Sequence, residues 1–132
     1  MRFRFTAAIA VAALLSFACG GVTDPSKNTI EQFSGTVPVA GVSQVKTFNV
    51  SNTGEITMIL TSLTPFTNVA LGVIFAQASS TGCDVLLQQN PFAFLNSTAI
   101  STSIIKGSYC VYLYDANGLT APENFTLSIS HP

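Results

Sequence analysis

Short segments in which apolar and polar residues alternate, separated by turn-forming residues, constrain the fold of this chain more than any other feature. Residues 124–130 (NFTLSIS) follow the pattern without exception, with Phe125, Leu127 and Ile129 on one side and hydroxyl-bearing residues on the other. A period of two residues is that of a β-strand with one buried and one exposed face. We therefore expect a strand here, with its apolar side chains in a core.

Seven further segments have the length and apolar content of strands. Residues 108–114 place Tyr109, Val111 and Leu113 on one face, and residues 69–77 are apolar on both faces, as in a central strand. The remaining candidates are residues 30–37, 44–50, 55–60, 84–88 and 98–105. Turn signals separate the segments at Asn52-Thr53-Gly54, Thr64-Pro65, Ser80-Thr81-Gly82, Asn90-Pro91, Lys106-Gly107 and Asn117-Gly118.

About eight strands at this spacing, with no helical periodicity after Cys19, predict an all-β fold, an antiparallel two-sheet β-sandwich of jelly-roll type. The 132 residues suffice for one domain with a core, and 48% hydrophobic against 8% charged residues excludes a disordered tail and a coiled coil. A net charge of −1 leaves no basic surface for nucleic acid.

Residues 1–18 have the parts of an export signal. Arg2 and Arg4 form a positive start, residues 7–18 are an uncharged apolar run, and small residues surround Cys19. This run is shorter than the roughly 20 helical residues that cross a bilayer, so we expect a signal peptide and not a membrane-spanning anchor.

Residues 15–19 (LSFAC) resemble a bacterial lipobox, in which the cysteine is lipidated and becomes the first residue. The alternative is cleavage after Ala18 by an ordinary signal peptidase, which would make the protein periplasmic or secreted. With a lipid on Cys19, residues 19–28 form a flexible tether and residues 29–132 the domain. Three lysines against six carboxylates then give the mature chain a net charge of −3, so we expect membrane contact through the lipid, at the outer membrane or its periplasmic face.

Two further cysteines, Cys83 and Cys110, remain after Cys19 is assigned to the anchor. A pair left over in an exported chain predicts a disulfide. A zinc site and a redox site are the alternatives. A zinc site needs more ligands than these two cysteines, and a redox site usually has a Cys-x-x-Cys spacing, which the sequence lacks.

A resemblance to a known family covers most of the expected domain. Residues 107–115 (GSYCVYLYD), a glycine-containing loop and residues 124–129 (NFTLSI) resemble the end of a bacterial pre-peptidase C-terminal domain, and residues 48–60 fit the same family. Cys110 stands where the family has the second aromatic residue of the penultimate strand, which fits a version with a Cys83–Cys110 bridge. The resemblance implies a β-sandwich with a binding or spacer role and no catalytic residues.

The residues that carry enzyme chemistry are scarce. His131 is the only histidine and the penultimate residue, where we expect it on the surface beyond the last strand. A catalytic triad or a zinc site needs a histidine that packing holds in place. The chain also lacks a Gly-x-Ser-x-Gly elbow, a His-Glu-x-x-His motif and a phosphate-binding glycine loop, so we expect no enzyme and no cofactor.

The carboxylates allow one ligand hypothesis. Asp115 and Asn117, followed by Gly118, carry the first oxygens and the glycine of a calcium loop, and Glu123 and Asp84 are candidates to complete it. The alternative is an ordinary turn, because Asn and Gly tolerate the positive φ that such turns require.

Tyr112 and Tyr114 share one face of their expected strand. If that face is exposed, the two rings form a surface that can stack on a sugar or hold an apolar partner. The alternative is that residues 90–96, which carry Phe92 and Phe94, fold over them.

Three classes of function follow from these residues. The first is a monomeric, non-catalytic, lipid-anchored cell-envelope module that binds another protein or serves a structural role. The second is a carbohydrate- or calcium-binding module that uses the Asp115–Glu123 end. The third, an enzyme, lacks a constellation of catalytic side chains.

Overall fold

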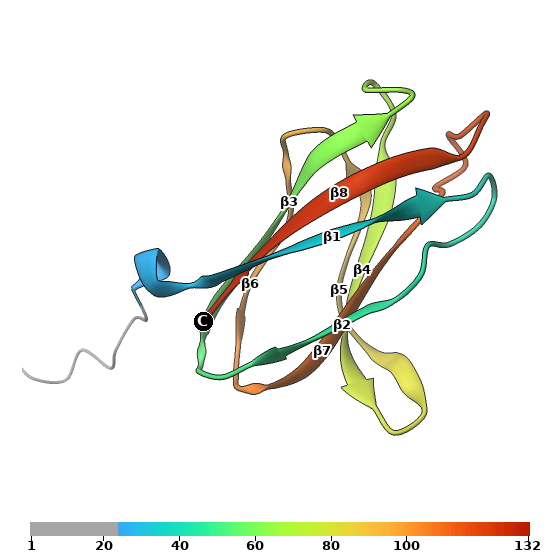
Figure 1. Ribbon diagram of the computed structural model, residues 1–132. Helices are drawn as coiled ribbons and strands as arrows, with labels where there is room; N and C mark the ends of the chain where they lie inside the picture. The colour runs from blue at the N-terminus through green and yellow to red at the C-terminus, as the bar shows by residue number, and fades with distance from the viewer. Residues whose placement is uncertain (1–23) are drawn as a thin grey trace, which may run out of the picture.

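The structure, a computed structural model, describes residues 24–132 (Figure 1). One short 3-10 helix precedes eight strands in the described part. They are η1 (Pro25–Lys27), β1 (Thr29–Val37), β2 (Lys46–Val50), β3 (Gly54–Thr64), β4 (Leu71–Ser79), β5 (Gly82–Ala93), β6 (Thr98–Ile104), β7 (Gly107–Tyr114) and β8 (Glu123–His131).

The strands form two four-stranded antiparallel sheets, in the orders β1-β8-β3-β6 and β2-β7-β4-β5. Successive strands alternate between the two sheets, except that β4 and β5 are neighbours in the same sheet and form a hairpin. This is the strand order of a jelly roll, so the expected two-sheet sandwich of about eight strands is confirmed. Figure 1 shows the β4–β5 hairpin projecting from one end of the sandwich.

The core lies between the sheets and contains the side chains that the alternation predicted. Phe125, Leu127 and Ile129 of β8 are buried, and Tyr109, Val111 and Leu113 of β7 face them from the other sheet. The central position expected for the doubly apolar segment is that of β4, which lies between β7 and β5.

β5 is longer than predicted. A turn was expected at Asn90-Pro91, yet the strand continues through both residues to Ala93. β5 is the edge strand of its sheet, and proline is tolerated there because an outward-facing N–H has no ladder partner to lose. The register with β4 shifts in this region, between Leu71 and Val73.

The expected signal peptide 1–18, Cys19 and residues 20–23 of the expected tether lie outside the described residues. The rest of that tether is ordered on the domain. Asp24 accepts a hydrogen bond from the Ser26 amide at 3.0 Å and caps η1, and the Asn28 side chain donates to Ser130 Oγ on β8 at 3.2 Å. In residues 24–132 no helix has the length and apolarity to cross a membrane.

His131 differs from its expected surface position. It is the last residue of β8, is 3% exposed, and stacks on Phe48 with a ring-centroid distance of 5.3 Å. Its Nε2 lies 3.0 Å from a carboxylate oxygen of Glu31, whose other oxygen lies 3.2 Å from Lys46 Nζ. The pairing of β1 with β8 runs to the last residues of both strands, so the chain end is held in the sheet and does not fray.

Candidate functional site

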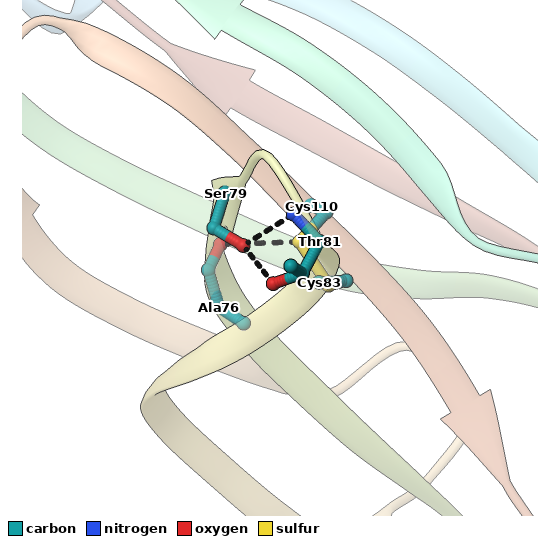
Figure 2. Close-up of a disulfide and its surroundings, with 5 residues drawn as sticks. All are labelled: Ala76, Ser79, Thr81, Cys83 and Cys110. Carbon is teal, nitrogen blue, oxygen red and sulfur yellow. Dashed lines mark hydrogen bonds between the residues drawn. A yellow bond between two sulfur atoms is a disulfide. The ribbon is translucent and has the colours of Figure 1, made fainter.

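The β4–β5 hairpin is joined to the neighbouring strand by a disulfide. Cys83, at the start of β5, is bonded to Cys110 in β7, with a Cα–Cα distance of 5.8 Å (Figure 2). Cys110 is fully buried, and β4 lies between the two bonded strands. The predicted disulfide is therefore present, and it holds the end of the projecting hairpin against the sheet.

The turn of this hairpin has its own hydrogen-bond network (Figure 2). Thr81 donates its backbone N–H to Ser79 Oγ at 3.1 Å and its hydroxyl to Asp84 Oδ2 at 2.6 Å. Hydrogen bonds from Ser79 and Thr81 lower the pKa of the Asp84 carboxyl group. Gly82, with φ of 138°, takes a conformation that favours glycine. Asp84 therefore stabilises a turn.

The outer edge of the hairpin is apolar. Three consecutive residues of β5, Val85, Leu86 and Leu87, are 48%, 57% and 46% exposed. Asp84 is the only charged residue of this strand. β5 pairs with β4 on one side only, so its other side presents unpaired backbone groups.

A pocket of about 400 Å³ lies at the base of the hairpin. Leu87 and Phe75 line it from one sheet, and Ile104 and Ile105 line it from β6 and the turn that follows. Ile105 is 64% exposed, so the apolar surface continues from the pocket to solvent. The β5/β6 side of the sandwich is thus open and apolar, whereas the Glu31–Lys46 ion pair bridges the sheets on the β1/β2 side.

The two candidate tyrosines line a second pocket, of about 350 Å³, on the outer face of the β2-β7-β4-β5 sheet. Tyr112 and Tyr114 are half-buried, and Ile74, Gln89 and the loop 40–42 complete the lining. Residues 90–96 do not form the expected loop over the two rings, because residues 90–93 continue β5 alongside β4, and Phe92 and Phe94 are 65% and 50% exposed. We call this pocket the tyrosine groove.

Asp115 and Asn117 lie at the end of the tyrosine groove and form a turn. Asp115 accepts backbone N–H groups of Ala40 at 2.8 Å, Gly118 at 2.8 Å and Leu119 at 3.2 Å. The hydrogen bond from Ala40 is the largest cause of a lowered pKa of Asp115. Asn117 has φ of 71°, as expected for a tight turn.

The structure does not bring the other candidate calcium ligands to Asp115. Glu123 is fully buried and accepts the Phe66 N–H at 3.0 Å, and its burial raises the pKa of the carboxyl group. Asp84 lies at the opposite end of β4, whose Gly72 pairs with Tyr114 and whose Ala78 pairs with Cys83. The joint site of Asp115, Glu123 and Asp84 is thus not formed, and residues 24–132 contain no group of three side chains arranged to hold a metal ion.

The apolar surface of the hairpin has a signal in the sequence. Residues 84–88 were expected to form a strand, but Val85, Leu86 and Leu87 interrupt the alternation with three consecutive apolar side chains. In a two-sheet sandwich only one face of a strand packs against the other sheet, so such a run cannot be buried on both faces, and its exposure marks a surface of interest.

No family model and no curated protein sequence matches the chain. Among solved structures, the chain is similar to a mitogen from Yersinia pseudotuberculosis, with a TM-score of 0.56, 14% sequence identity and coverage of 80% of this chain and 87% of that one. It is also similar to the pre-peptidase C-terminal domain of a collagenase from Bacillus anthracis, with a TM-score of 0.45, 19% identity and coverage of 78% and 87%. At 14% identity, the similarity to the mitogen shows the β-sandwich fold alone.

Proposed function

We propose that this chain is an exported, lipid-anchored and non-catalytic module of the cell envelope, which acts as a monomer and binds another envelope protein through the β4–β5 hairpin. The observation that carries the proposal is the exposed apolar run Val85-Leu86-Leu87 on an edge strand that is fixed by a disulfide and borders an apolar pocket. The resemblance of residues 15–19 to a lipobox supports the anchor.

The chemistry of β5 defines the partner segment. Soluble proteins often protect an exposed edge with lysine or proline; β5 has no lysine, and its proline, Pro91, lies beyond the apolar run 85–87. An exposed edge can pair with an extended segment of another chain, which gains main-chain hydrogen bonds and places alternate side chains on one face. An apolar side chain of that segment, next to Leu87, would occupy the pocket between Phe75 and Ile104. The partner we propose is therefore an extended peptide segment with apolar side chains.

The disulfide supports the same role. A binding segment that is already held in its bound conformation loses little conformational entropy on association. The Cys83–Cys110 bond and the Ser79–Thr81–Asp84 network both restrain the hairpin at the end that carries the apolar run.

A photo-crosslinking amino acid at position 86, in protein located in the envelope, is expected to form an adduct with the partner, whereas the same group at Ile30 is not. Ile30 is the matched control, because it is 65% exposed but lies on β1, an edge of the other sheet. With the purified partner, Leu87→Asp is expected to weaken binding at least about tenfold, the effect of placing a charge in an apolar contact, and Ile30→Asp to leave it unchanged.

Equal adducts from both positions, or an unchanged affinity in Leu87→Asp, would contradict the proposal. Sedimentation of the purified domain tests a different occupant of β5. A dimer that Leu87→Asp dissociates would assign the edge strand to a second copy of this chain.

Cys19→Ala is expected to move the protein from the membrane fraction to the soluble periplasmic fraction. A single acyl chain already gives measurable membrane binding and several give stable anchoring, so loss of the lipidated residue removes the attachment. Fractionation with a carbonate wash, together with metabolic labelling by palmitate, measures the change. Continued retention of Cys19→Ala in washed membranes would show that the lipid is not the anchor.

A further inference from the structure

We propose that the tyrosine groove binds an uncharged saccharide. It lies on the outer face of β7, β4 and β5, at the end where the β1–β2 loop meets the end of β7. The β4–β5 hairpin turn and its pocket lie at the other end of β4. The site is thus separate from the proposed protein-binding surface, and neither proposal depends on the other.

The floor of the groove is a rigid aromatic and aliphatic surface. Tyr112 pairs directly with Ile74, and Ile74 pairs with Gln89 on its other side, so the three side chains form one row across three strands. Tyr114 forms the next row with Gly72. Aromatic faces of this kind pack against the C–H faces of sugar rings, which are apolar although the ring edges carry hydroxyl groups.

The ring of Tyr114 is held flat on the sheet. A Cβ atom placed on Gly72 would lie within 2.5 Å of three atoms of that ring, so the ring occupies the space that a side chain at position 72 would take. Packing of an aromatic ring over a strand glycine fixes the ring and covers the backbone beneath it. Tyr114 is half-buried and lines the groove, so part of the ring faces the open space of the pocket.

Hydrogen-bonding groups stand at the margin of this surface. Gln89 Nε2 donates to Tyr114 Oη at 2.6 Å. This bond leaves the Tyr114 hydroxyl proton as a donor and Gln89 Oε1 as an acceptor. A hydroxyl of a sugar is itself both donor and acceptor, so adjacent donor and acceptor groups beside an aromatic face match its edge.

The charges in the groove favour a neutral ligand. The Asp115 carboxylate already accepts three backbone N–H groups. None of the three lysines in residues 24–132 lines the groove. An anionic sugar would therefore meet a carboxylate with no cation beside it, and its charge would lose hydration without a counter-ion. A neutral polyol meets no such penalty.

Titration of the purified domain with cellohexaose, xylohexaose and chitohexaose tests the proposal. The chain has no tryptophan, so its intrinsic fluorescence comes from three tyrosines, of which Tyr112 and Tyr114 line the groove and Tyr109 is buried in the core. We expect saturable binding of at least one of these neutral oligosaccharides. Tyr112→Ala is expected to weaken that binding at least about tenfold through loss of stacking, and Tyr112→Phe, which keeps the ring, less than about threefold.

Tyr114→Phe keeps the ring on Gly72 and removes the hydroxyl, so the fold is retained and binding is expected to weaken about fivefold, as for one hydrogen bond. Phe92→Ala is the matched control, because Phe92 is exposed and does not line the groove. The affinity of this variant for the oligosaccharide should equal that of the wild type. Absence of saturable binding to all three oligosaccharides, wild-type affinity in Tyr112→Ala, or equally tight binding of hexagalacturonate would each overturn the proposal.

Discussion

Replacement of Cys83 and Cys110 by serine is expected to lower the free energy of unfolding by about 3–4 kcal/mol. The bond closes a loop with a sequence separation of 27 residues, and a cross-link over this length removes conformational entropy from the unfolded chain. The loss is a large fraction of the about 5–15 kcal/mol that stabilises a typical domain. Urea unfolding, followed by circular dichroism, measures it.

Ser79→Ala is the control for this experiment. It removes the hydrogen bonds of Thr81 to Ser79 in the same turn but leaves the disulfide intact, so a decrease of about 1 kcal/mol or less is expected. Hydrogen exchange should also rise in residues 76–90 of the cysteine-free variant, because the start of β5 then loses its covalent link to β7 and keeps its connection to the sheet through β4. A decrease no larger than that of Ser79→Ala would show that the disulfide contributes little to stability.

Glu123→Ala is expected to lower the free energy of unfolding by about 2–4 kcal/mol. The substitution leaves the Phe66 N–H without its acceptor and opens a cavity where a fully buried side chain stood. Glu123→Gln keeps an acceptor oxygen and nearly the same volume, so it should be close to the wild type or more stable. Glu55→Gln, on an exposed residue, is the control and should change stability by less than about 0.5 kcal/mol.

The pH dependence of stability distinguishes Glu123 from the other carboxylates. Because burial raises the pKa of Glu123 above its ordinary 4.5, the folded protein holds this proton more tightly than the unfolded chain does. Its contribution to stability is therefore present below pH 4.5 and is lost as the pH rises through the raised pKa. Glu123→Gln should thus gain stability relative to the wild type between pH 4 and 7. A constant difference over that range would contradict the assignment.

Glu31 affects the pH dependence of stability in the opposite direction. Its hydrogen bond with His131, followed by the contacts with Lys46, lowers its pKa, so its contribution is present above the ordinary value of 4.5 and is lost as the pH falls through the lowered one. Measurements of Glu123→Gln against the wild type cancel this second effect, because both proteins contain Glu31.

Most strands could be predicted from the sequence because they bury one face and expose the other. Phe125, Leu127 and Ile129 identify β8 at once. The same alternation, extended by one step at each end, places Glu123 and His131 on the buried face as well, and both are buried. His131 was expected on the surface because it is the penultimate residue, and Glu123 was expected as a calcium ligand beside a loop, but the alternation of the strand places both side chains on its buried face.

The candidate surfaces were predictable only in part. The two-residue period of a strand predicts that Tyr112 and Tyr114 share one face, and in the structure both side chains line the tyrosine groove. Whether that face is covered depends on where residues 90–96 run, and this follows from the pairing of β5 with β4 through Pro91. Residues 40–42 of the β1–β2 loop form one wall of the groove. Ala40 lies 75 residues before Asp115 in the sequence, so no local pattern could predict this contact.

The pairing of the first strand with the last determines how the proposed anchor would orient the domain. β1 begins opposite the end of β8, and Figure 1 shows η1 and the C-terminus at the same end of the sandwich, from which the β4–β5 hairpin also projects. The stretch from Cys19 to Asp24 spans at most about 18 Å when fully extended. A lipid on Cys19 would thus keep the side of the sandwich that carries η1 and the C-terminus close to the bilayer, with the tyrosine groove at the opposite end of the domain.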